Sequence, residues 1–484
     1  MTVGGIVDSA RGWPRPWRSG NPVLNERLRL PPPLIARRIP SGRGAMEQPN
    51  NTSETTPMTR RFWVALVATG VVTGLLGVLM MLVLHTVQHL AFGYHQGPFG
   101  SAVERVPQER RLGALVLGGA VVGVAWYTLR RVTAGSSDVD DAVWTGTGEL
   151  AIRRSLATGV ISEIAVGTGG SLGREAAPKL AGAASGSLLA RWAGLDTGHR
   201  RLIVACGAGA GMGAVYNVPL GGALITAELL IGQLTLPVLL PALVCSVVAT
   251  VISWVYLPTT VTYPGLPALP LHGSHVGYAV LAGPLIGVIA VALVRLIGWI
   301  SHHQLRGRLV LVGPLLAFAV LGLCALPFPL LLGNGKDLTH EAFLGLAPTG
   351  LLVLVALAPL KPLVTILCLG SGASGGLFTP VLTTGAILGL LLGQLWGHVW
   401  PGGPVAAFAV ITAAALVGAA TQAPLTGLVL VLELTGNAES LIVPMVLATT
   451  LASLVVRHLD GYSIYSARLQ RRDVMTEPVD AIHA

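Results

Sequence analysis

Charged residues are scarce in this chain. Asp, Glu, Lys and Arg make up 11% of its 484 residues, whereas 52% are hydrophobic. A soluble protein usually carries about 25% charged residues, and the mean hydropathy here is +0.70. The shortage of charge argues against an ordinary soluble domain and favours a membrane protein.

Cysteine is also rare, with four residues in the whole chain. They lie far apart within apolar runs, so they lack the spacing of a disulfide framework or a metal-binding motif. We expect all four to be small core residues, namely Cys206, Cys245, Cys324 and Cys368.

Acidic residues are outnumbered by basic ones, and the formal net charge is +9. Much of the basic excess lies in the two tails, at Arg11–Arg61 and Arg457–Arg472. Basic flanks are typical of the cytoplasmic ends of membrane proteins. The sequence therefore predicts that both termini are cytoplasmic and that no nucleic acid is bound. Residues 1–58 also lack apolar periodicity, which predicts a disordered basic N-terminal tail.

Long hydrophobic runs, in contrast, are abundant. Runs near the ~20 residues that cross a bilayer are Phe62–Leu84, Leu112–Leu129, Leu236–Tyr256, Val276–Ile300, Leu309–Leu332, Leu351–Leu369 and Ile442–Val456. Shorter runs are Leu180–Leu195, Leu202–Val215, Leu220–Ile231, Phe408–Ala420 and Leu425–Leu434. The lengths predict a polytopic helical protein of the cell inner membrane or plasma membrane, surrounded by lipid.

Two glycine-rich segments interrupt these runs, at Gly167–Pro178 and Gly370–Pro380. Non-helical backbone inside a membrane is tolerated only where it lines a cavity or is buried in protein. Each segment leads directly into an apolar helix, whose N-terminus presents free N–H groups and a positive dipole end. Two such helix ends predict an anion pathway.

The chain also repeats itself. Asn217–Leu229 and Gln422–Leu434 share a Pro-Leu pair, a Gly, a Glu and a final Leu. Each follows its glycine-rich break at a similar distance, and paired interruptions indicate a binding site at a repeat interface. We expect two membrane repeats, 59–258 and 259–460, followed by the end of the last helix and a cytoplasmic tail at 461–484.

These elements resemble the CLC family of chloride channels and proton/chloride antiporters. The matching segments are Gly173-Arg-Glu175, Gly376-Leu-Phe-Thr-Pro380, the two Pro-Leu helices and Ser463-Ile-Tyr-Ser466. The resemblance covers about residues 60 to 470. It implies an all-α fold of two inverted-topology repeats with broken and half-length helices, assembled as a homodimer. It also implies chloride transport of the voltage-gated channel type, with no enzymatic activity and no cofactor.

Glu175 corresponds to the family's gating glutamate. An ionised carboxylate among apolar residues is costly and usually functional, and at a helix N-terminus it competes with chloride until protonation releases it. The plainer interpretation is a helix-capping acid paired with Arg174. The family's Gly-Arg-Glu-Gly-Pro is Gly-Arg-Glu-Ala-Ala-Pro here, which leaves the shape of this helix start open.

The resemblance assigns further anion contacts to the backbone N–H groups of Leu377 and Phe378 and to the hydroxyls of Ser136 and Tyr465. The alternates for the two hydroxyls are Ser137 and Tyr462. Each position also has a plainer interpretation. Leu377 and Phe378 suit apolar packing, Tyr465 suits an interfacial anchor, and Ser136 suits an ordinary turn.

Three residues bear on whether chloride transport is coupled to protons, namely Glu228, Glu433 and Leu229. Glu228 and Glu433 end the repeated Pro-Leu helices, so a shared structural role at a neighbouring helix end is expected. In family antiporters a second acid commonly follows the residue corresponding to Glu228. Leu229 stands there and cannot titrate, which favours passive conduction.

Glu163 is the substitute proton acceptor that the sequence offers, because it lies in an apolar run just before the first break. Packing against one of two nearby arginines, Arg153 or Arg154, explains this acid equally well. The sequence therefore leaves both a channel and a proton-coupled chloride antiporter as modes of transport.

Two other interpretations remain. A fluoride-selective transporter fits the departures at Ser136 and Leu229, and nitrate is a further anion that amide-lined sites discriminate only modestly. From another class, Gly372–Gly375 resembles the motif around the nucleophile of rhomboid intramembrane serine proteases. That chemistry needs a histidine within hydrogen-bond reach of Ser374, and His398 is one of the later histidines available.

Overall fold

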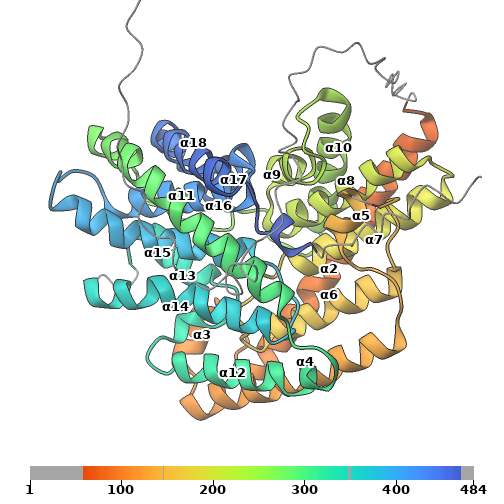
Figure 1. Ribbon diagram of the computed structural model, residues 1–484, viewed down its shortest axis with the longest axis horizontal. Helices are drawn as coiled ribbons and strands as arrows, with labels where there is room; N and C mark the ends of the chain where they lie inside the picture. Colours follow the sequence, from red (N-terminus) through yellow and green to blue (C-terminus); the bar gives the residue numbers. More distant parts are fainter. Residues whose placement is uncertain (1–57, 145, 347–349, 470–484) are drawn as a thin grey trace, which may run out of the picture. The chain divides into compact units, whose positions relative to one another are not determined.

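The computed structural model describes residues 58–469, apart from 145 and 347–349, and this part of the chain is helical without a named strand (Figure 1). The α-helices are α2 (Arg60–Phe92), α3 (Phe99–Arg105), α4 (Gln108–Val132), α5 (Val139–Trp144), α6 (Ile152–Gly167), α7 (Ala176–Trp192), α8 (Thr197–Tyr216), α9 (Pro219–Leu224), α10 (Leu236–Ser253), α11 (Gly273–His302), α12 (Gly313–Cys324), α13 (Lys336–Leu344), α14 (Leu351–Gly370), α15 (Phe378–Gly397), α16 (Val405–Thr421), α17 (Pro424–Thr435) and α18 (Ile442–Leu459). Shorter or tighter turns are the π-helix η1 (Ile225–Ile231) and the 3₁₀ helices η2 (Gly307–Leu311), η3 (Pro329–Leu331), η4 (Glu439–Leu441) and η5 (Ser466–Arg468). The predicted all-α class is confirmed, whereas residues 1–57 of the predicted tail, 1–58, lie outside the described residues.

Eight helical segments of the described chain are long and apolar enough to cross a bilayer. They include all seven runs predicted from the sequence and add α15, which was not on that list. The run Leu309–Leu332 is divided, however. Helix α12 ends at Cys324 and η3 begins at Pro329, because proline lacks the N–H that would continue the helix.

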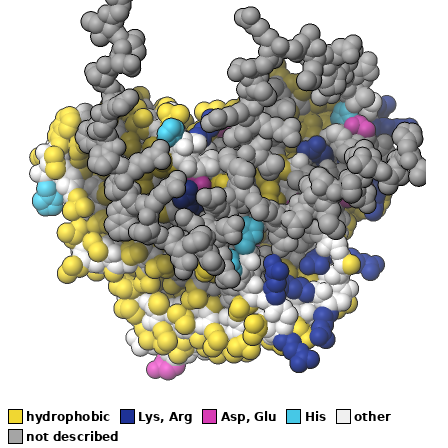
Figure 2. All heavy atoms as spheres, viewed as in Figure 1, with side chains coloured by type: hydrophobic (Ala, Val, Ile, Leu, Met, Phe, Trp, Pro, Cys, Tyr) yellow, Lys and Arg dark blue, Asp and Glu magenta, His cyan; other side chains and the backbone are white. Residues whose placement is uncertain are grey.

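The outward faces of these helices are hydrophobic. On α2, for example, Val64 is 62% exposed and Leu90 is 75% exposed, while Phe62 and Leu66 on the inward face are fully buried. Figure 2 shows hydrophobic side chains over much of the periphery. Such a surface suits lipid rather than water, so the chain is a multi-pass membrane protein.

A core of mostly small side chains joins α2, α8 and α10. Cys206 of α8 and Cys245 of α10 belong to it, and Cys368 is buried as well. Three of the four cysteines are therefore core residues, as predicted, whereas Cys324 at the end of α12 is only half-buried.

Two corresponding turns reveal the internal repeat. Among the described residues, Asn217 and Gln422 are the non-glycine residues with positive φ, and both have φ of 56°. Asn217 ends α8 and Gln422 ends α16. A proline then starts the next helix in each half, at Pro219 and Pro424.

The repeated glutamates lock these halves together reciprocally. Glu228 accepts hydrogen bonds from the backbone N–H groups of Leu425 and Thr426 at the start of α17, at 3.2 and 2.6 Å. Glu433 accepts from Leu220 and Gly221 at the start of α9, at 3.0 and 2.6 Å. The predicted structural role at a neighbouring helix end is confirmed.

The two glycine-rich breaks also meet. Gly173 and Gly376 exchange two backbone hydrogen bonds, both of 2.7 Å. The repeat boundaries at 258 and 259 fall between α10 and α11 and remain a prediction. The last helix was expected to continue beyond residue 460, but α18 ends at Leu459 and only the short turn η5 follows. The tail from residue 470 lies outside the described residues.

Candidate functional site

Glu175 lies at the contact between the two breaks and is only 2% exposed. It occupies the N-cap position of α7, yet its side chain does not cap that helix. Its Oε1 instead accepts a 2.7 Å hydrogen bond from the backbone N–H of Phe378, the first residue of α15. The carboxylate therefore caps the helix of the second break, where the dipole favours negative charge.

Two hydroxyl groups complete the surroundings of this carboxylate. Oε2 of Glu175 accepts from the hydroxyl of Thr379 at 3.1 Å and from that of Tyr216 at 3.2 Å. These two hydroxyls are themselves 2.6 Å apart. Sequence reasoning missed both residues, although Thr379 lies inside the Gly-Leu-Phe-Thr-Pro motif and Tyr216 directly precedes the first repeated turn.

A glycine lies on each side of the carboxylate. A Cβ atom added at Gly173 or at Gly376 would collide with the side chain of Glu175. Because these two residues have no side chain, the carboxylate can lie directly against the backbone bridge between them. The plainer interpretation paired Arg174 with Glu175, but the ion pairs found in the described part of the chain do not include one between them. The guanidinium of Arg174 instead lies 4.7 Å from the centre of the Tyr216 ring.

A cavity of about 200 Å³ extends from Glu175. It is lined from both repeats and from the segment after α18, including Ser137, Glu175, Lys179, Leu377, Tyr465 and Arg468. Its volume exceeds the ~30 Å³ share of a liquid water several times over, so a small anion with some of its hydration fits.

Three of the predicted anion contacts lie at this cavity or at the carboxylate. Leu377 is the N-cap of α15 and lines the cavity, while the N–H of Phe378 is occupied by Glu175. Tyr465 also lines the cavity, although it lies on the turn before η5 and not on a helix. Tyr462, the alternate, is not among the lining residues.

The two serines differ in position. Ser137 lines the cavity, whereas Ser136 does not. The hydroxyl of Ser136 accepts the backbone N–H of Asp138 at 3.1 Å, and its carbonyl accepts that of Ala151 at 3.1 Å. Ser136 therefore has the contacts of a turn residue, and Ser137 is the serine that lines the cavity.

Lys179 brings a positive charge to the cavity wall. Its ammonium forms a 2.8 Å ion pair with Asp140 and lies 4.5 Å from the centre of the Tyr465 ring. Sequence reasoning assigned this lysine no role. The geometry places its positive charge at the wall of the cavity.

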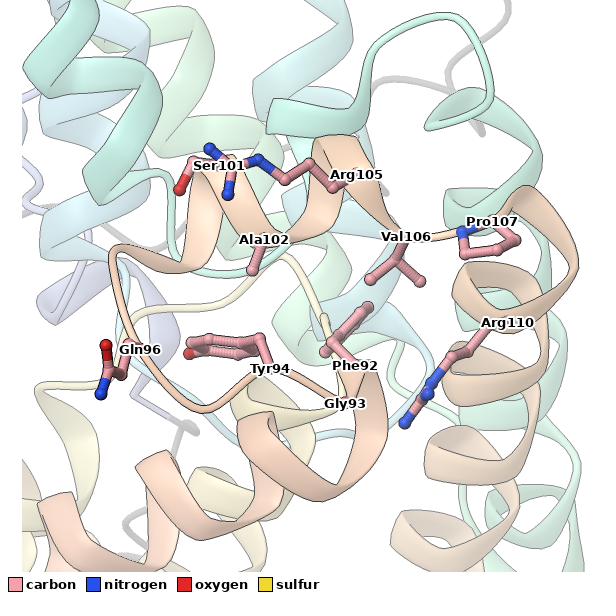
Figure 3. A pocket seen from close by; sticks show the side chains of 10 residues that line it. All are labelled: Phe92, Gly93, Tyr94, Gln96, Ser101, Ala102, Arg105, Val106, Pro107 and Arg110. Atoms are coloured by element: carbon pink, nitrogen blue, oxygen red, sulfur yellow. The ribbon is translucent and has the colours of Figure 1, made fainter.

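A second, larger cavity of about 340 Å³ is separate from these residues (Figure 3). Arg110 reaches toward the end of α2 there, and its Nε and Nη2 donate to the carbonyls of Ala91 and Leu90 at 3.1 and 3.2 Å. Its guanidinium thus caps a helix C-terminus. None of the predicted site residues lines this cavity.

The protease interpretation fails for His398. Ser374 precedes α15, whereas His398 is the C-cap of the same helix. A helix of 20 residues is about 30 Å long, so the histidine cannot act as a base for the serine. Its Nδ1 instead lies 2.9 Å from the carbonyl of Gln394.

Known proteins of one family are similar to this chain over most of its length. Residues 113–457 match the family model described as "Voltage gated chloride channel". The chain is 33% identical over 399 residues to a putative chloride channel protein ClcB-like from Ralstonia nicotianae, covering 78% of this chain and 90% of that protein. It is also 33% identical over 319 residues to the H(+)/Cl(-) exchange transporter ClcA from Yersinia pestis, covering 63% and 66%.

A solved structure shares the fold. The X-ray crystal structure of a slow cyanobacterial Cl⁻/H⁺ antiporter aligns with a TM-score of 0.73 at 23% identity, covering 84% of this chain and 96% of that one. Together with the family match over residues 113–457, these similarities confirm the resemblance that the motifs indicated. The chain belongs to the voltage-gated chloride channel, or CLC, family.

Proposed function

We propose that this protein carries chloride across the membrane through the contact between its two glycine-rich breaks, with Glu175 as the gate. The observation that carries the proposal is the 2.7 Å hydrogen bond from the Phe378 N–H to the Glu175 carboxylate. A carboxylate oxygen there stands in the place of a small anion, at the N-terminus of α15.

Protonation of Glu175 opens this gate. The ionised carboxylate is held by one backbone N–H and two hydroxyl groups. Once neutral, it binds those donors less strongly, since charge-assisted hydrogen bonds are roughly twice as strong as neutral ones. Chloride from the cavity then takes its place at the N–H of Phe378.

The cavity supplies the remaining contacts of the anion. The hydroxyls of Ser137 and Tyr465 and the N-cap residue Leu377 line it, and Lys179 adds positive charge. No cofactor is needed for this function, because the transported ion is the only ligand. An enzymatic role has no place in the proposal.

The mode of transport has two candidates. A passive channel is favoured by Leu229, which lies on η1 where family antiporters commonly have an acid. Proton-coupled exchange is the second candidate. It is favoured by the buried carboxylate of Glu163, which has no hydrogen-bond partner among the described residues. Relatives of this chain carry names of both kinds, chloride channel and H(+)/Cl(-) exchange transporter.

The assembly and the membrane belong to the proposal as well. We expect a homodimer in the cell inner membrane, with both termini in the cytoplasm. Crosslinking in native membranes tests the dimer. Labelling of single cysteines introduced in the two tails tests their side.

Chloride efflux from liposomes between pH 4.5 and pH 7.5 tests the gate. Wild-type flux should rise as the pH falls, whereas E175Q should be nearly independent of pH. Glu341 supplies a matched control, because burial first and then Glu104 and Asp337 raise the pKa of its carboxyl to about 7. E341Q should keep the wild-type pH dependence.

Absence of chloride flux from the wild-type protein would contradict the proposal, as would an E175Q variant with the wild-type pH profile. Replacing chloride by fluoride or nitrate in the same vesicles measures selectivity. A large preference for fluoride would replace chloride as the transported ion.

A further inference from the structure

Three arginines from three separate segments meet at the end of α4. Arg130 lies in the last turn of α4, Arg154 lies in the first turn of α6, and Arg306 directly precedes η2. Among the described residues, the charges acting on the Arg130 guanidinium are those of Arg154 and Arg306, both of like sign. Cations held this close repel one another, so the arrangement favours a bound anion.

Within the described part of the chain, no acidic side chain forms an ion pair with these arginines. Nη1 of Arg154 donates to the carbonyl of Thr133 at 3.1 Å, just beyond the end of α4. Arg130 lies over the ring of Trp126, 5.3 Å from its centre. A carbonyl and an aromatic ring carry no full negative charge, so the cluster keeps its positive charge.

Two glycines of α4 determine where the cluster forms. A Cβ at Gly119 would lie 2.6 Å from the carbonyl oxygen of Pro314, and one at Gly123 would lie 2.6 Å from that of Leu311. Helix α4 therefore packs directly against the backbone of α12 and η2. These contacts run antiparallel, so the last turn of α4 lies beside the segment that carries Arg306.

That segment is fixed by hydrogen bonds to the end of α14. Nε2 of Gln304 donates to the carbonyl of Leu369 at 3.1 Å, and the backbone N–H of Leu305 donates to that of Gly370 at 3.2 Å. The backbone before Arg306 is thus held in place without a ligand. A site prepared in this way loses less entropy when it binds.

Lipid-facing side chains lead up to the cluster along both helices. Leu117 and Val124 of α4, Leu309 of η2 and Leu316 of α12 are all more than half exposed. Figure 2 shows basic side chains beside hydrophobic ones on one part of the surface. An acyl chain can lie along this apolar surface with its headgroup at the arginines, because guanidinium groups bind phosphate oxygens in pairs.

The cluster lies on the side of the membrane proposed for the cytoplasm. Helices α2 and α4 are each long and apolar enough to cross once, so the end of α4 returns to the side on which α2 begins. The cytoplasmic leaflet is the one that carries much of the anionic lipid. A soluble phosphate offers the same oxygen atoms, but the apolar surface beside the arginines favours a lipid.

We propose that Arg130, Arg154 and Arg306 bind the phosphate group of an anionic phospholipid from the cytoplasmic leaflet, with an acyl chain along α4 and α12. This binding does not require chloride transport, so it can be tested separately from the proposed function. The headgroup lies close to the anion pathway, because Arg130 covers Trp126 and Trp126 lines the 200 Å³ cavity.

Thermal melting of the purified protein in detergent tests the site. Added phosphatidylglycerol should raise the melting temperature, because a ligand that binds only the folded state stabilises it. Zwitterionic phosphatidylcholine should leave the melting temperature unchanged. R130Q and R306Q should each weaken the apparent affinity for phosphatidylglycerol about fivefold, since one cation near anionic lipid contributes about 1 kcal/mol. The double variant R130Q/R306Q should show no rise at the lipid concentration that saturates the wild type.

Arg457 supplies the matched control, because it is an exposed arginine in the last turn of α18. R457Q should keep the wild-type affinity for phosphatidylglycerol. Arg306 is exposed as well, so R306Q carries the test if R130Q does not fold.

Inorganic phosphate at the same concentration distinguishes a lipid from a soluble anion, and it should leave the melting temperature unchanged. An equal rise with inorganic phosphate or with phosphatidylcholine would overturn the proposal. A wild-type affinity for phosphatidylglycerol in R306Q, or a loss of affinity in R457Q as large as that in R306Q, would also overturn it.

Discussion

The two glycine-rich breaks have similar backbone arrangements, but one supplies a hydrogen-bond acceptor and the other a donor. Each contributes one glycine to the bridge between Gly173 and Gly376, and each leads into a helix directed away from it. The first break carries a carboxylate at Glu175. The second break supplies the backbone N–H of Phe378, which donates a hydrogen bond to that carboxylate.

A different pair of elements shows the opposite behaviour. Glu228 and Glu433 have the same structural role in the two halves. Glu228 accepts hydrogen bonds from two backbone N–H groups at the start of α17, and Glu433 accepts two at the start of α9. The repeat is thus symmetric where it holds the fold together and asymmetric where an anion is proposed to bind. Asymmetry between repeats is therefore a guide to the working residues.

The largest effect is expected from Gly376→Ala, which breaks the contact between the two breaks. The added Cβ would collide with the side chain of Glu175, and overpacking of this kind costs about 1–3 kcal/mol. Since the displaced carboxylate no longer occupies the pathway, we expect chloride flux at pH 7.5 to rise by about tenfold and to lose its pH dependence, about 1.4 kcal/mol being a factor of ten. Gly397→Ala at the far end of α15 is the control, because nothing lies within 4 Å of a Cβ there.

A smaller effect, on stability, is expected from Glu228→Ala and Glu433→Ala. Each change leaves two backbone N–H groups without their acceptor, and an unsatisfied buried donor costs about 1–3 kcal/mol. Both variants should melt at lower temperature in detergent. E228A should lose at least as much, because Glu228 also accepts the hydroxyl of Thr426 at 2.7 Å. A normal melting temperature for either variant would argue against the symmetric role.

The smallest effect is expected from Lys179→Met at the cavity wall. The change removes a cation and leaves Asp140 unpaired, so the half-saturating chloride concentration should rise about fivefold, or about 1 kcal/mol. The double variant K179M/D140N should recover part of this loss. An unchanged concentration dependence in K179M would show that the lysine does not attract the anion.

Local pattern was enough to predict the membrane class, the two breaks and the repeat. Their signals lie within short stretches, such as the apolar runs and the Pro-Leu pair followed by a glutamate. The structural role of Glu228 and Glu433 also followed, because both occupy the same place in a repeated helix.

Contacts between the halves were harder to predict. Tyr216 and Thr379 are 163 residues apart in sequence, and only the packing of the two halves brings both to Glu175. Ser136 and Ser137 are neighbours in a turn, and which of them faces the cavity depends on the backbone conformation of that turn. The placement of Tyr465 depends on where α18 ends, which hydropathy alone does not determine.

The central claim is that the Glu175 carboxylate occupies an anion site at the N-terminus of α15. Crystals of E175Q grown in bromide test it directly, because bromide is detected by anomalous scattering. We predict a bromide ion within hydrogen-bond distance of the Phe378 N–H, in the place of the wild-type carboxylate. No anomalous peak there, with the glutamine side chain still bound to Phe378, would contradict the account.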